Sequence, residues 1–358
     1  MKILLVRLRL VGDVVFTTPV IRAVRRKYPE AELTYLVEPS AAAVVQANPH
    51  LDDVIVVPRA SGLSRIMGDA ALAWRLRRRQ FDLAIDMHGG PRAAWLTWAT
   101  GAPARIGYDI KGRRWMYTTV VDRSPDLAAR HSVVNQWDLL RTLDVGDCDP
   151  TRDAVEMAEA PRAMASVEAR LAAAAIDATH PLVLIHVSAG NPFRRWPAAA
   201  FEDLVVGLVE RDAHRRIVLT SGPSEAAAAS GIASRARARL GPLAAAVPDL
   251  GEFDLAELRA LAGRASVYIG GDSGPMHIAA TTDTPIVALL GPTLPERSKP
   301  WRDPRLFSEI VDVSLPCRPC HQRTCEPGDF RCLTWIEPAR VLDAAERALA
   351  AGALTRSN

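Results

Sequence analysis

The sequence predicts an α/β protein of two domains, each a parallel sheet flanked by helices. At roughly 150 residues per domain, a chain of 358 residues is long enough for two domains that each bury a core. Short apolar runs alternate along this chain with stretches of helical periodicity, and most of the runs end in Gly, Ser or Asp. That alternation is typical of βαβ units, whose strands are parallel and buried on both faces.

The first half begins with an apolar run at residues 2–8 that is rich in Leu and β-branched residues, and we predict it to be a buried strand. A turn at 11–13 follows, and then a helical stretch at 19–28 whose polar face is basic. Further strands are predicted at residues 32–38, 54–58 and 81–87.

The second half repeats this pattern, with strands predicted at residues 182–188, 216–222, 266–272 and 284–291 and helices at 198–211 and 256–264. The strand pattern lapses at 153–181, an Ala-, Glu- and Pro-rich segment that we expect to contain the domain boundary. We therefore assign residues 1–165 to the first domain and 175–336 to the second. We expect a last helix, in residues 337–358, to pack back toward the first domain.

The composition excludes several classes of protein. With 49% hydrophobic and 24% charged residues, the chain is globular rather than disordered or fibrous. No apolar run approaches the ~18–20 residues that a membrane-spanning helix needs. The apolar start is interrupted by Arg7, Arg9 and Asp13 and lacks a small-residue cleavage site, so we expect a first strand rather than a secretion signal, and a cytoplasmic protein.

The net charge of +3 conceals an asymmetry, because residues 1–141 sum to +8 and residues 142–358 to −5. Arginines alternate with tryptophans in the basic part, at 74–79, 92–98 and 113–115. Such a part suits nucleic acid, an anionic membrane surface or a phosphorylated substrate, and solvated helix faces are the alternative. No nucleic-acid module accompanies these residues, so we expect a membrane surface or a phosphorylated glycolipid as partner, and no nucleic acid.

A Gly12-Asp13 turn joins the first predicted strand to the first predicted helix. Gly12 permits a tight turn, and an Asp at the carboxyl end of a parallel strand lies where such sheets bind ligands. Asp13 is therefore a candidate general base. The alternative is that Asp13 caps the helix beginning near Val14, a frequent function of Asp.

Two Gly-rich turns follow predicted strands of the second domain, and the one at 270–277 contains Asp272, Ser273, Gly274 and His277. Its glycines let a ligand approach the backbone, and the start of a helix favours a phosphate or sugar hydroxyls. Asp272 can accept hydrogen bonds from hydroxyls. The alternative is a structural turn with a satisfied histidine.

The other turn, at 186–197, offers Ser188 and Gly190 as donors to a diphosphate and Arg194 or Arg195 as its counter-charge. Glu225 follows the next strand, where acidic residues bind ribose hydroxyls in nucleotide-binding sheets; otherwise it is a helix-start Glu without a ligand. The sequence contains no Walker A and no G-x-G-x-x-G motif, which argues against an ordinary NTPase or a dinucleotide oxidoreductase.

Four of the five cysteines lie close together, at Cys317, Cys320, Cys325 and Cys332. In a cytoplasmic chain, thiols at this spacing suggest a structural zinc or an iron–sulfur cluster. The alternative is a loop of reduced, partly buried cysteines.

Together these motifs resemble glycosyltransferase family 9, the bacterial lipopolysaccharide heptosyltransferases. The early Gly-Asp turn combined with a glycine–aspartate motif before a histidine is specific for that family. The matching segments cover nearly the whole chain: Arg7, Gly12-Asp13-Val14, Thr17-Thr18-Pro19, Ile85-Asp86-x-His88-Gly89, Arg105-Ile106-Gly107-Tyr108, Arg194-Arg195-Trp196-Pro197, Gly271-Asp272-Ser273-Gly274-Pro275-Met276-His277, Gly291-Pro292-Thr293 and the cysteine segment.

The resemblance implies a GT-B fold, in which two Rossmann-like domains face a central cleft and bind the acceptor and the nucleotide-sugar, respectively. It implies transfer of a heptose from ADP-heptose to the Kdo or heptose of the inner core, as on Kdo-lipid A. The transfer inverts the anomeric centre and requires no cofactor. It also implies a protein at the inner face of the cytoplasmic membrane. The alternatives are a same-fold transferase with another donor or acceptor, and a nucleotide- or carbohydrate-binding protein without activity.

By position, the resemblance makes Asp13 the catalytic base and Asp272 the contact to the donor sugar. Arg194 stands where the family usually has Lys. The other donor-binding candidates are Ser188 and Gly190 along the diphosphate, Arg195, Glu225 at the ribose, and Ser273, Gly274 and His277 around the sugar. The acceptor-binding candidates are Arg92, Arg113 and Arg114.

Overall fold

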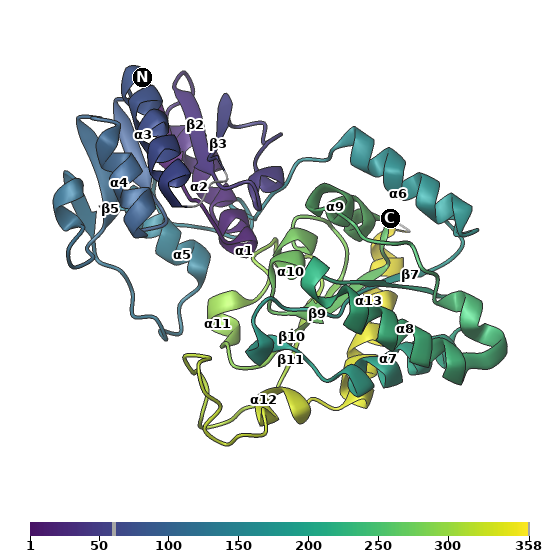
Figure 1. The fold of residues 1–358 in the computed structure, drawn as a ribbon. Coiled ribbons are helices and arrows are strands. Elements are labelled where there is room, and N and C mark those ends of the chain that lie inside the picture. Colours follow the sequence, from purple (N-terminus) through teal and green to yellow (C-terminus); the bar gives the residue numbers. More distant parts are fainter. Residues whose placement is uncertain (59–61, 357–358) are drawn as a thin grey trace. The chain divides into compact units, whose positions relative to one another are not determined.

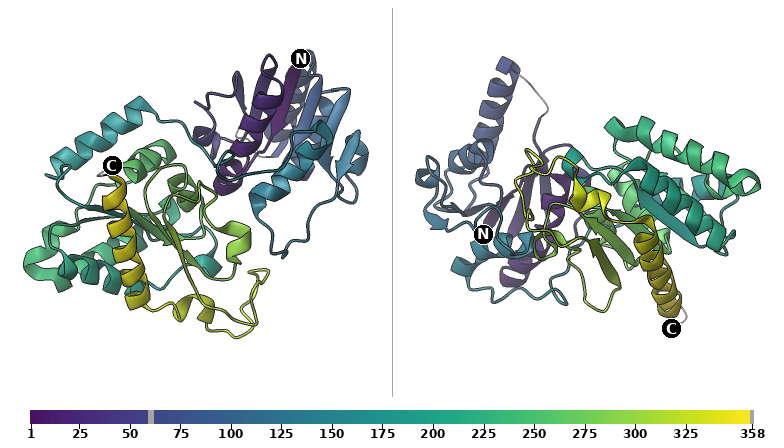
Figure 2. Two further views of the ribbon diagram at one scale, coloured as in Figure 1. Left: turned by 180° about the vertical axis from the view of Figure 1, so that it is seen from behind. Right: turned by 90° about the horizontal axis from the view of Figure 1, so that it is seen from below.

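The computed structural model describes residues 1–58 and 62–356, and the chain divides into two compact units, residues 1–158 and 159–358 (Figure 1). Each unit contains one sheet whose hydrogen-bonded neighbours are all parallel among the described strands. Helices flank the strands of each unit (Figure 2). The predicted fold class, two parallel-sheet α/β domains, is confirmed.

The sheet of the first unit has the strand order β3-β2-β1-β4-β5-β6. Its strands are β1 (Lys2–Val6), β2 (Glu32–Val37), β3 (Asp53–Val56), β4 (Leu83–Asp86), β5 (Ala104–Tyr108) and β6 (Thr119–Val121). The first four confirm the predicted strands, whereas β5 and β6 were not predicted. The order reverses between β1 and β4, so the loops after these two strands flank the usual ligand position of a doubly wound sheet.

Helices cover both faces of this sheet. On one face, α3 and α4 pack on alternate strand residues such as Leu4 and Val6, which share a core with Leu72 and Leu96. The helical elements are α1 (Val11–Val15), α2 (Thr18–Lys27), α3 (Gly62–Arg78), α4 (Pro91–Ala99), α5 (Ser132–Trp137) and the 3₁₀ turns η1 (Ala42–Val44), η2 (Arg114–Met116) and η3 (Asp138–Leu143). The helix predicted at 19–28 is confirmed as α2.

The sheet of the second unit has the order β11-β10-β9-β7-β8, so its reversal lies between β7 and β9. Its strands are β7 (Leu182–His186), β8 (Arg216–Thr220), β9 (Val267–Gly271), β10 (Ile286–Leu290) and β11 (Ser308–Asp312). Its helical elements are α6 (Pro161–Ala173), η4 (Pro192–Arg194), α7 (Ala198–Arg211), η5 (Pro223–Glu225), α8 (Ala226–Leu240), η6 (Gly241–Ala246), α9 (Leu255–Arg264), α10 (Gly274–Ala279), α11 (Pro295–Ser298), α12 (Arg331–Thr334) and α13 (Pro338–Arg356). The four predicted strands of this half are confirmed, and β11 was not predicted.

Each sheet has a core of its own. In the second unit, alternate residues such as Val183 and Ile185 of β7 share a buried cluster with Phe201 of α7 and Ile232 of α8. No helix in the described part of the chain is long and apolar enough to cross a bilayer.

The division between the units falls earlier than the sequence suggested. Helix α6 packs against α9, so residues 161–165, which were assigned to the first domain, belong to the second unit. The predicted boundary segment at 153–181 contains the observed division, which lies between residues 158 and 159.

The last helix, α13, packs against α7 and strands β9, β10 and β11, all in the second unit. Its buried stripe of Val341, Ala344, Ala345 and Ala348 joins the core of that sheet. This small apolar stripe completes the core beside α7, and the packing of the segment toward the first domain stays a prediction. Residues 357 and 358 of the segment lie outside the described residues.

Candidate functional site

Asp13 lies on the short helix α1, directly after the loop that leaves β1. Its Oδ2 pairs with Nη2 of Arg7 at 2.5 Å and accepts a hydrogen bond from the backbone N–H of Leu10 at 3.3 Å. The second contact is part of a capping box: Asp13 lies at the third position of a helix that begins at Val11 and has Leu10 as its N-cap, whereas the alternative interpretation made Asp13 the cap of a helix beginning near Val14. The side chain is nevertheless 34% exposed, so Asp13 takes part in the capping box and still presents a carboxylate to solvent.

Arg7 is buried under this carboxylate and links the loops that follow β1 and β4. Its Nη1 donates a hydrogen bond to the backbone carbonyl of Met87 at 2.6 Å. Burial opposes the charge of Arg7, but the charge of Asp13 and their hydrogen bond outweigh burial and raise the pKa of Arg7. The pair is therefore ionic, and it fixes the direction of the Asp13 carboxylate. Arg7 was part of the resemblance, but no role was predicted for it.

His88 follows β4 and lies close to the same pair. Burial and the neighbouring Arg7 charge lower the pKa of His88 to about 4, so its ring is neutral at neutral pH. Its Nδ1 accepts a hydrogen bond from the backbone N–H of Leu8 at 3.3 Å. The ring proton of the neutral form therefore sits on Nε2, which makes Nε2 a hydrogen-bond donor.

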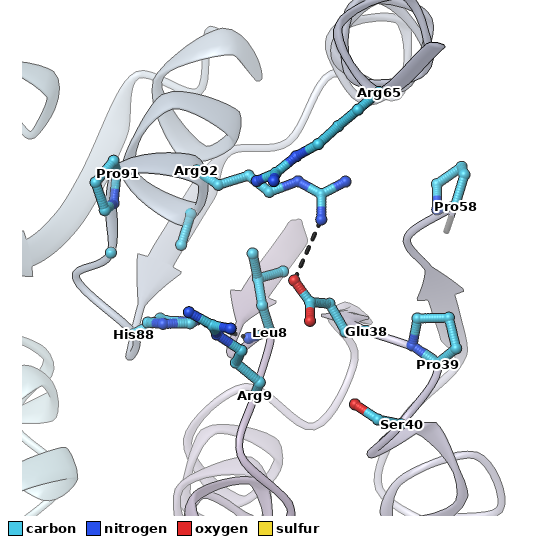
Figure 3. Close-up of a pocket in the computed structure, with 12 residues that line it drawn as sticks. Leu8, Arg9, Glu38, Pro39, Ser40, Pro58, Arg65, His88, Pro91 and Arg92 are labelled. Atoms are coloured by element: carbon cyan, nitrogen blue, oxygen red, sulfur yellow. Dashed lines mark hydrogen bonds and ion pairs between the residues drawn. The ribbon is translucent and has the colours of Figure 1, made fainter. Parts of the chain in front are cut away.

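A pocket of about 430 Å³ opens beside these loops (Figure 3). Arg65 of α3 and Arg92 of α4 reach into it and pair with the same carboxylate, Asp69, at 3.9 and 2.5 Å. Arg92 also pairs with Glu38 at 3.2 Å. The residues that line the pocket are Leu8, Arg9, Glu38, Pro39, Ser40, Pro58, Arg65, His88, Gly90, Pro91, Arg92 and Ala93. Its three guanidinium groups and neutral imidazole suit an acidic ligand that also has hydroxyls.

The three arginines predicted to bind the acceptor do not come together. Arg92 lines the pocket. Arg113 and Arg114 do not: Arg113 is the N-cap of the turn η2, and Arg114 is its first residue. Arg114 pairs with Asp109 at 3.5 Å. Arg9 and Arg65 line the pocket instead, and Arg9, at the end of the β1 loop, is the one whose position after a strand could have indicated this role.

In the second unit, Asp272 follows β9 and is 2% exposed. Its Oδ2 lies 2.9 Å from Nη1 of Arg194, and its Oδ1 lies 3.6 Å from Nε2 of His277 and accepts a hydrogen bond from Ser298. Burial would raise the pKa of Asp272, but the bond to His277, the charge of Arg194 and the Ser298 hydroxyl hold it well below its usual range. Asp272 is therefore a carboxylate.

Arg194 is the last residue of η4, and it has a second partner besides Asp272. Its Nε donates to Oε1 of Gln322 at 2.7 Å, and the same oxygen accepts a hydrogen bond from Nδ2 of Asn191 at 2.9 Å. Nε2 of Gln322 lies 3.4 Å from the hydroxyl of Thr293. Gln322 and Ser298 were not predicted from the sequence. Thr293 was quoted only for the resemblance, and its place after β10 was the available signal.

Ser188 joins the loops that follow β7 and β8. Its hydroxyl lies 3.2 Å from Nε2 of His186 and accepts a hydrogen bond from the backbone N–H of Gly222 at 2.9 Å. Nδ1 of His186 lies 3.0 Å from the hydroxyl of Thr220, and burial lowers the pKa of His186 to about 4. A neutral histidine thus helps to shape the loop. Two residues after Ser188, the backbone at Gly190 is open: a Cβ built there would have no atom within 4 Å.

Arg195 is directed away from Arg194. Its Nη2 lies 2.5 Å from Oε1 of Glu225, and its Nε donates to the carbonyl of Ala189 at 2.8 Å. The Ser224 hydroxyl donates to the same carboxylate oxygen at 2.7 Å. Arg195 therefore orients Glu225, and Arg194 is the arginine beside Asp272.

A smaller cavity of about 170 Å³ lies beside Glu225, between α8 and residues 248–253. Apolar and polar residues both form its wall. The lining residues are Leu219, Thr220, Ser221, Ala226, Ala229, Ser230, Ala233, Arg237, Pro248, Asp249, Gly251, Glu252 and Phe253. A cavity lined by apolar side chains together with polar groups suits a heterocycle.

The four clustered cysteines are half-buried. Burial raises the pKa of Cys332 to about 11; the Arg318 charge opposes that rise, and the other three thiols add to it. Among the residues that the structure describes, no three Cys, His, Asp or Glu side chains are arranged to hold a metal ion. The residues therefore do not fit the predicted zinc or iron–sulfur site as they stand.

Comparison with known proteins shows the family to which the chain belongs. The family model described as glycosyltransferase family 9 (heptosyltransferase) matches residues 70–330. Lipopolysaccharide heptosyltransferase 3 of Escherichia coli is 27% identical over 303 residues, which cover 82% of this chain and 84% of that protein.

Two solved structures share the fold over nearly their whole length. A family 9 glycosyl transferase from Veillonella parvula DSM 2008 gives a TM-score of 0.84 at 23% identity and covers 98% of this chain and 97% of its own. The E. coli ADP-heptose lps heptosyltransferase II gives 0.77 at 21% identity, with 98% and 99% covered. Because the family model spans most of the sequence, the chain belongs to glycosyltransferase family 9 and is a glycosyltransferase of the GT-B fold.

Proposed function

We propose that this enzyme transfers a heptose from ADP-heptose to a Kdo or heptose residue of the lipopolysaccharide inner core, at the cytoplasmic face of the membrane. The observation that supports this most is the Asp13 carboxylate, oriented by the buried Arg7 cation beside a pocket that contains Arg9, Arg65 and Arg92. The names of the relatives, which are lipopolysaccharide heptosyltransferases, support the donor and acceptor classes.

In this proposal the second unit binds the donor. The adenine occupies the cavity beside α8, and Glu225, held by Arg195, accepts hydrogen bonds from the ribose hydroxyls. The diphosphate lies along the open backbone at Gly190 with Arg194 as its counter-charge. Asp272 accepts hydrogen bonds from the heptose hydroxyls because its carboxylate is ionised and buried beside Arg194.

The first unit binds the acceptor and activates it. The acidic groups of a Kdo-bearing acceptor pair with the pocket arginines, and Nε2 of His88 donates a hydrogen bond to an acceptor oxygen. The acceptor hydroxyl oxygen then attacks the anomeric carbon from the face opposite the diphosphate, and its proton passes to Asp13. The bond from the anomeric carbon to the diphosphate oxygen breaks, ADP leaves with the electron pair, and Arg194 offsets the added charge. No step of this mechanism uses the cysteine loop or a metal.

The test is to incubate the purified protein with ADP-heptose and a Kdo-bearing lipid A and to follow ADP release and product mass. We expect one heptose to be added per ADP released. A protein that neither binds ADP-heptose nor transfers heptose would contradict the proposed donor, and one that binds it tightly without transfer would contradict the proposed acceptor.

Replacing Asp13 tests the base. Asp13→Asn should retain ADP-heptose binding but lose at least ~100-fold in turnover, the usual scale for loss of a general base. Asp144→Asn is the matched control, because its side chain is fully exposed in the same unit, at 100%. Asp13→Glu keeps the charge beside Arg7 and serves as a second variant should Asn disturb folding. Near-normal turnover of a folded Asp13→Asn protein would refute the role.

A further inference from the structure

Three tryptophans from separate segments of the first unit are exposed on one surface, formed by α3, α4 and η2. The exposed fractions of Trp74, Trp98 and Trp115 are 60%, 43% and 60%. Trp98 and Trp115 pack edge to face with their ring centroids 5.7 Å apart, and the Arg78 guanidinium lies 4.6 Å from the centre of the Trp74 ring. We define the tryptophan–arginine surface as Trp74, Arg77, Arg78, Trp98, Arg105 and Trp115.

The surface is hollowed rather than flat. A cavity of about 390 Å³ lies between Trp74 and Trp98, with Arg77 and Arg105 in its wall. Arg77 lies over Gly101, whose φ is +67° and where a Cβ would be 2.4 Å from Nη1 of Arg77. A glycine is thus needed for the guanidinium to lie there, at the edge of the cavity.

The positive charge of this surface is not neutralised by neighbouring acids. Within the described residues, no carboxylate pairs with Arg75, Arg77 or Arg78, which are all exposed near the end of α3. The next arginine, Arg79, differs, because it pairs with Asp53 at 2.5 Å. Arg105 donates to the backbone carbonyls of residues 102 and 116, contacts that leave its charge uncompensated. The surface therefore attracts anions.

Helix α3 extends the apolar part of the surface. Met67, Ala71, Trp74 and Arg78 follow one another at helical spacing, so they share one face, and all four are exposed. Met67 is 74% exposed and its neighbour Ile66 is 66% exposed. An apolar face bordered by arginines is typical of helices that lie in the interface of a membrane. The helix connects two features, because Arg65 lines the pocket near its start and Trp74 belongs to the surface near its end.

We infer that the tryptophan–arginine surface and the exposed face of α3 dock the first unit onto an anionic phospholipid bilayer. The tryptophan rings enter the headgroup layer, where an amphipathic ring is stable, and the arginines lie against lipid phosphates. Single-stranded RNA also binds arginines and aromatic rings. It has no aliphatic surface, however, that would cover the exposed Met67 and Ile66. A second copy of this surface would bring like charges together. The inference concerns binding alone and does not depend on the transfer reaction.

The test measures sedimentation of the full-length protein with vesicles of phosphatidylcholine, with and without phosphatidylglycerol, and with no donor or acceptor present. Binding is expected only to the anionic vesicles and should weaken as salt is raised. The double variant Trp74→Ala/Trp115→Ala should bind at least ~10-fold more weakly. Arg77→Gln/Arg78→Gln should lose roughly 5-fold per arginine.

The second unit supplies a matched control. Trp335 is 52% exposed and has the Arg331 guanidinium 5.1 Å from its ring centre, the same kind of pair as Trp74 and Arg78. Trp335→Ala should bind vesicles like the unaltered protein. All variants should keep the far-UV circular dichroism spectrum and the unfolding midpoint of the unaltered protein, which shows that they are folded.

Three outcomes would overturn the inference. One is equal binding to neutral and anionic vesicles, or none to either. Another is equal loss in Trp335→Ala and in the first-unit variants. The third is displacement from vesicles by RNA, or by a soluble core oligosaccharide that competes for the pocket. Failure of heptose transfer in a protein that still binds anionic vesicles would refute the proposed function only.

Discussion

Gln322 holds two polar groups of the proposed diphosphate site with one oxygen, since both Arg194 and Asn191 donate to its Oε1. The residue lies in the cysteine segment, about 130 positions along the chain from both partners. Its φ of 55° is left-handed. We infer that Gln322 positions Arg194 for the donor without touching the reacting atoms.

Shortening this side chain should therefore weaken donor binding. Gln322→Asn tolerates the left-handed backbone but cannot reach both partners, and we expect KM for ADP-heptose to rise ~10-fold with a smaller change in kcat, since a hydrogen bond to a charged group is lost. Gln80→Asn is the matched control, because Gln80 also has a left-handed φ of 56°, in the first unit. Initial-rate kinetics check this, and an unchanged KM in Gln322→Asn would rule out the positioning role.

His186 makes the stability of the second unit depend on pH. Burial lowers its pKa from an ordinary value near 6.5 to about 4, so as pH falls the unfolded chain takes up the proton first. The free energy of unfolding therefore keeps its full value, as far as His186 is concerned, above pH 6.5. It falls by on the order of 3 kcal/mol as the pH falls toward 4.

Urea unfolding at several pH values between 7 and 4 measures this loss. His186→Gln should flatten the dependence of the unfolding free energy on pH over that interval, whatever its effect on stability at pH 7. The exposed His214 of the same unit provides the control variant His214→Gln. The same slope in His186→Gln and in the unaltered protein would show that another group is responsible.

At the scale of single residues, the sequence predicted the site positions that depend on topology but missed their partners. Motif and strand pattern together predicted that Asp13 and Asp272 follow strands at the ligand-binding edge, and both do follow strands that flank the reversals of sheet order; their roles stay predictions. Gln322 and Ser298 were missed because only the folded chain brings them to Arg194 and Asp272. Arg113 and Arg114 do not line the pocket that contains Arg92, since a run of basic residues does not indicate which way it faces, and their role stays a prediction.

At the scale of elements, strands made of continuous apolar runs were predictable, including the edge strands β3 and β8, and strands without such a run were not. The eight predicted strands are nearly continuous apolar runs, as strands covered on both faces must be. The missed strands β6 and β11 lie at sheet edges and are only partly buried, and β5 includes Arg105 and Gly107. Such strands form because a neighbour offers hydrogen-bonding groups, a cause that does not appear in local hydrophobicity.

Helix α13 gives a prediction at this scale. Val341 is fully buried in the core that α13 shares with α7, so Val341→Ala should lower the free energy of unfolding of the second unit by about 2 kcal/mol. The exposed Arg340 beside it supplies the control Arg340→Ala, whose effect should stay below about 1 kcal/mol. Denaturation monitored by fluorescence checks both. A negligible effect of Val341→Ala would mean that α13 is not part of this core.

At the scale of the whole molecule, the chain consists of two complete α/β units, each with its own core and its own proposed ligand. ADP-heptose should therefore slow amide hydrogen exchange in the second unit, at 188–194, 222–226 and 272–277, because binding stabilises only the folded loops that touch it. Mass spectrometry with the intact protein measures this. Protection confined to residues 1–158 would mean that the first unit, and not the second, binds ADP-heptose.

The ion pair between Arg194 and Asp272 has a consequence for the end of the reaction cycle. In the proposed donor complex, a phosphate pairs with Arg194 and the sugar hydroxyls donate hydrogen bonds to Asp272. A ligand that carries both groups therefore gives each residue a new partner when it separates the ion pair. ADP without the sugar offers a partner to Arg194 alone. Asp272 then attracts Arg194 again and competes with the phosphate for it. If ADP-heptose is the donor, as we propose, we expect ADP to bind less firmly than the intact donor and to be a weak product inhibitor, because the Arg194–Asp272 pair forms again.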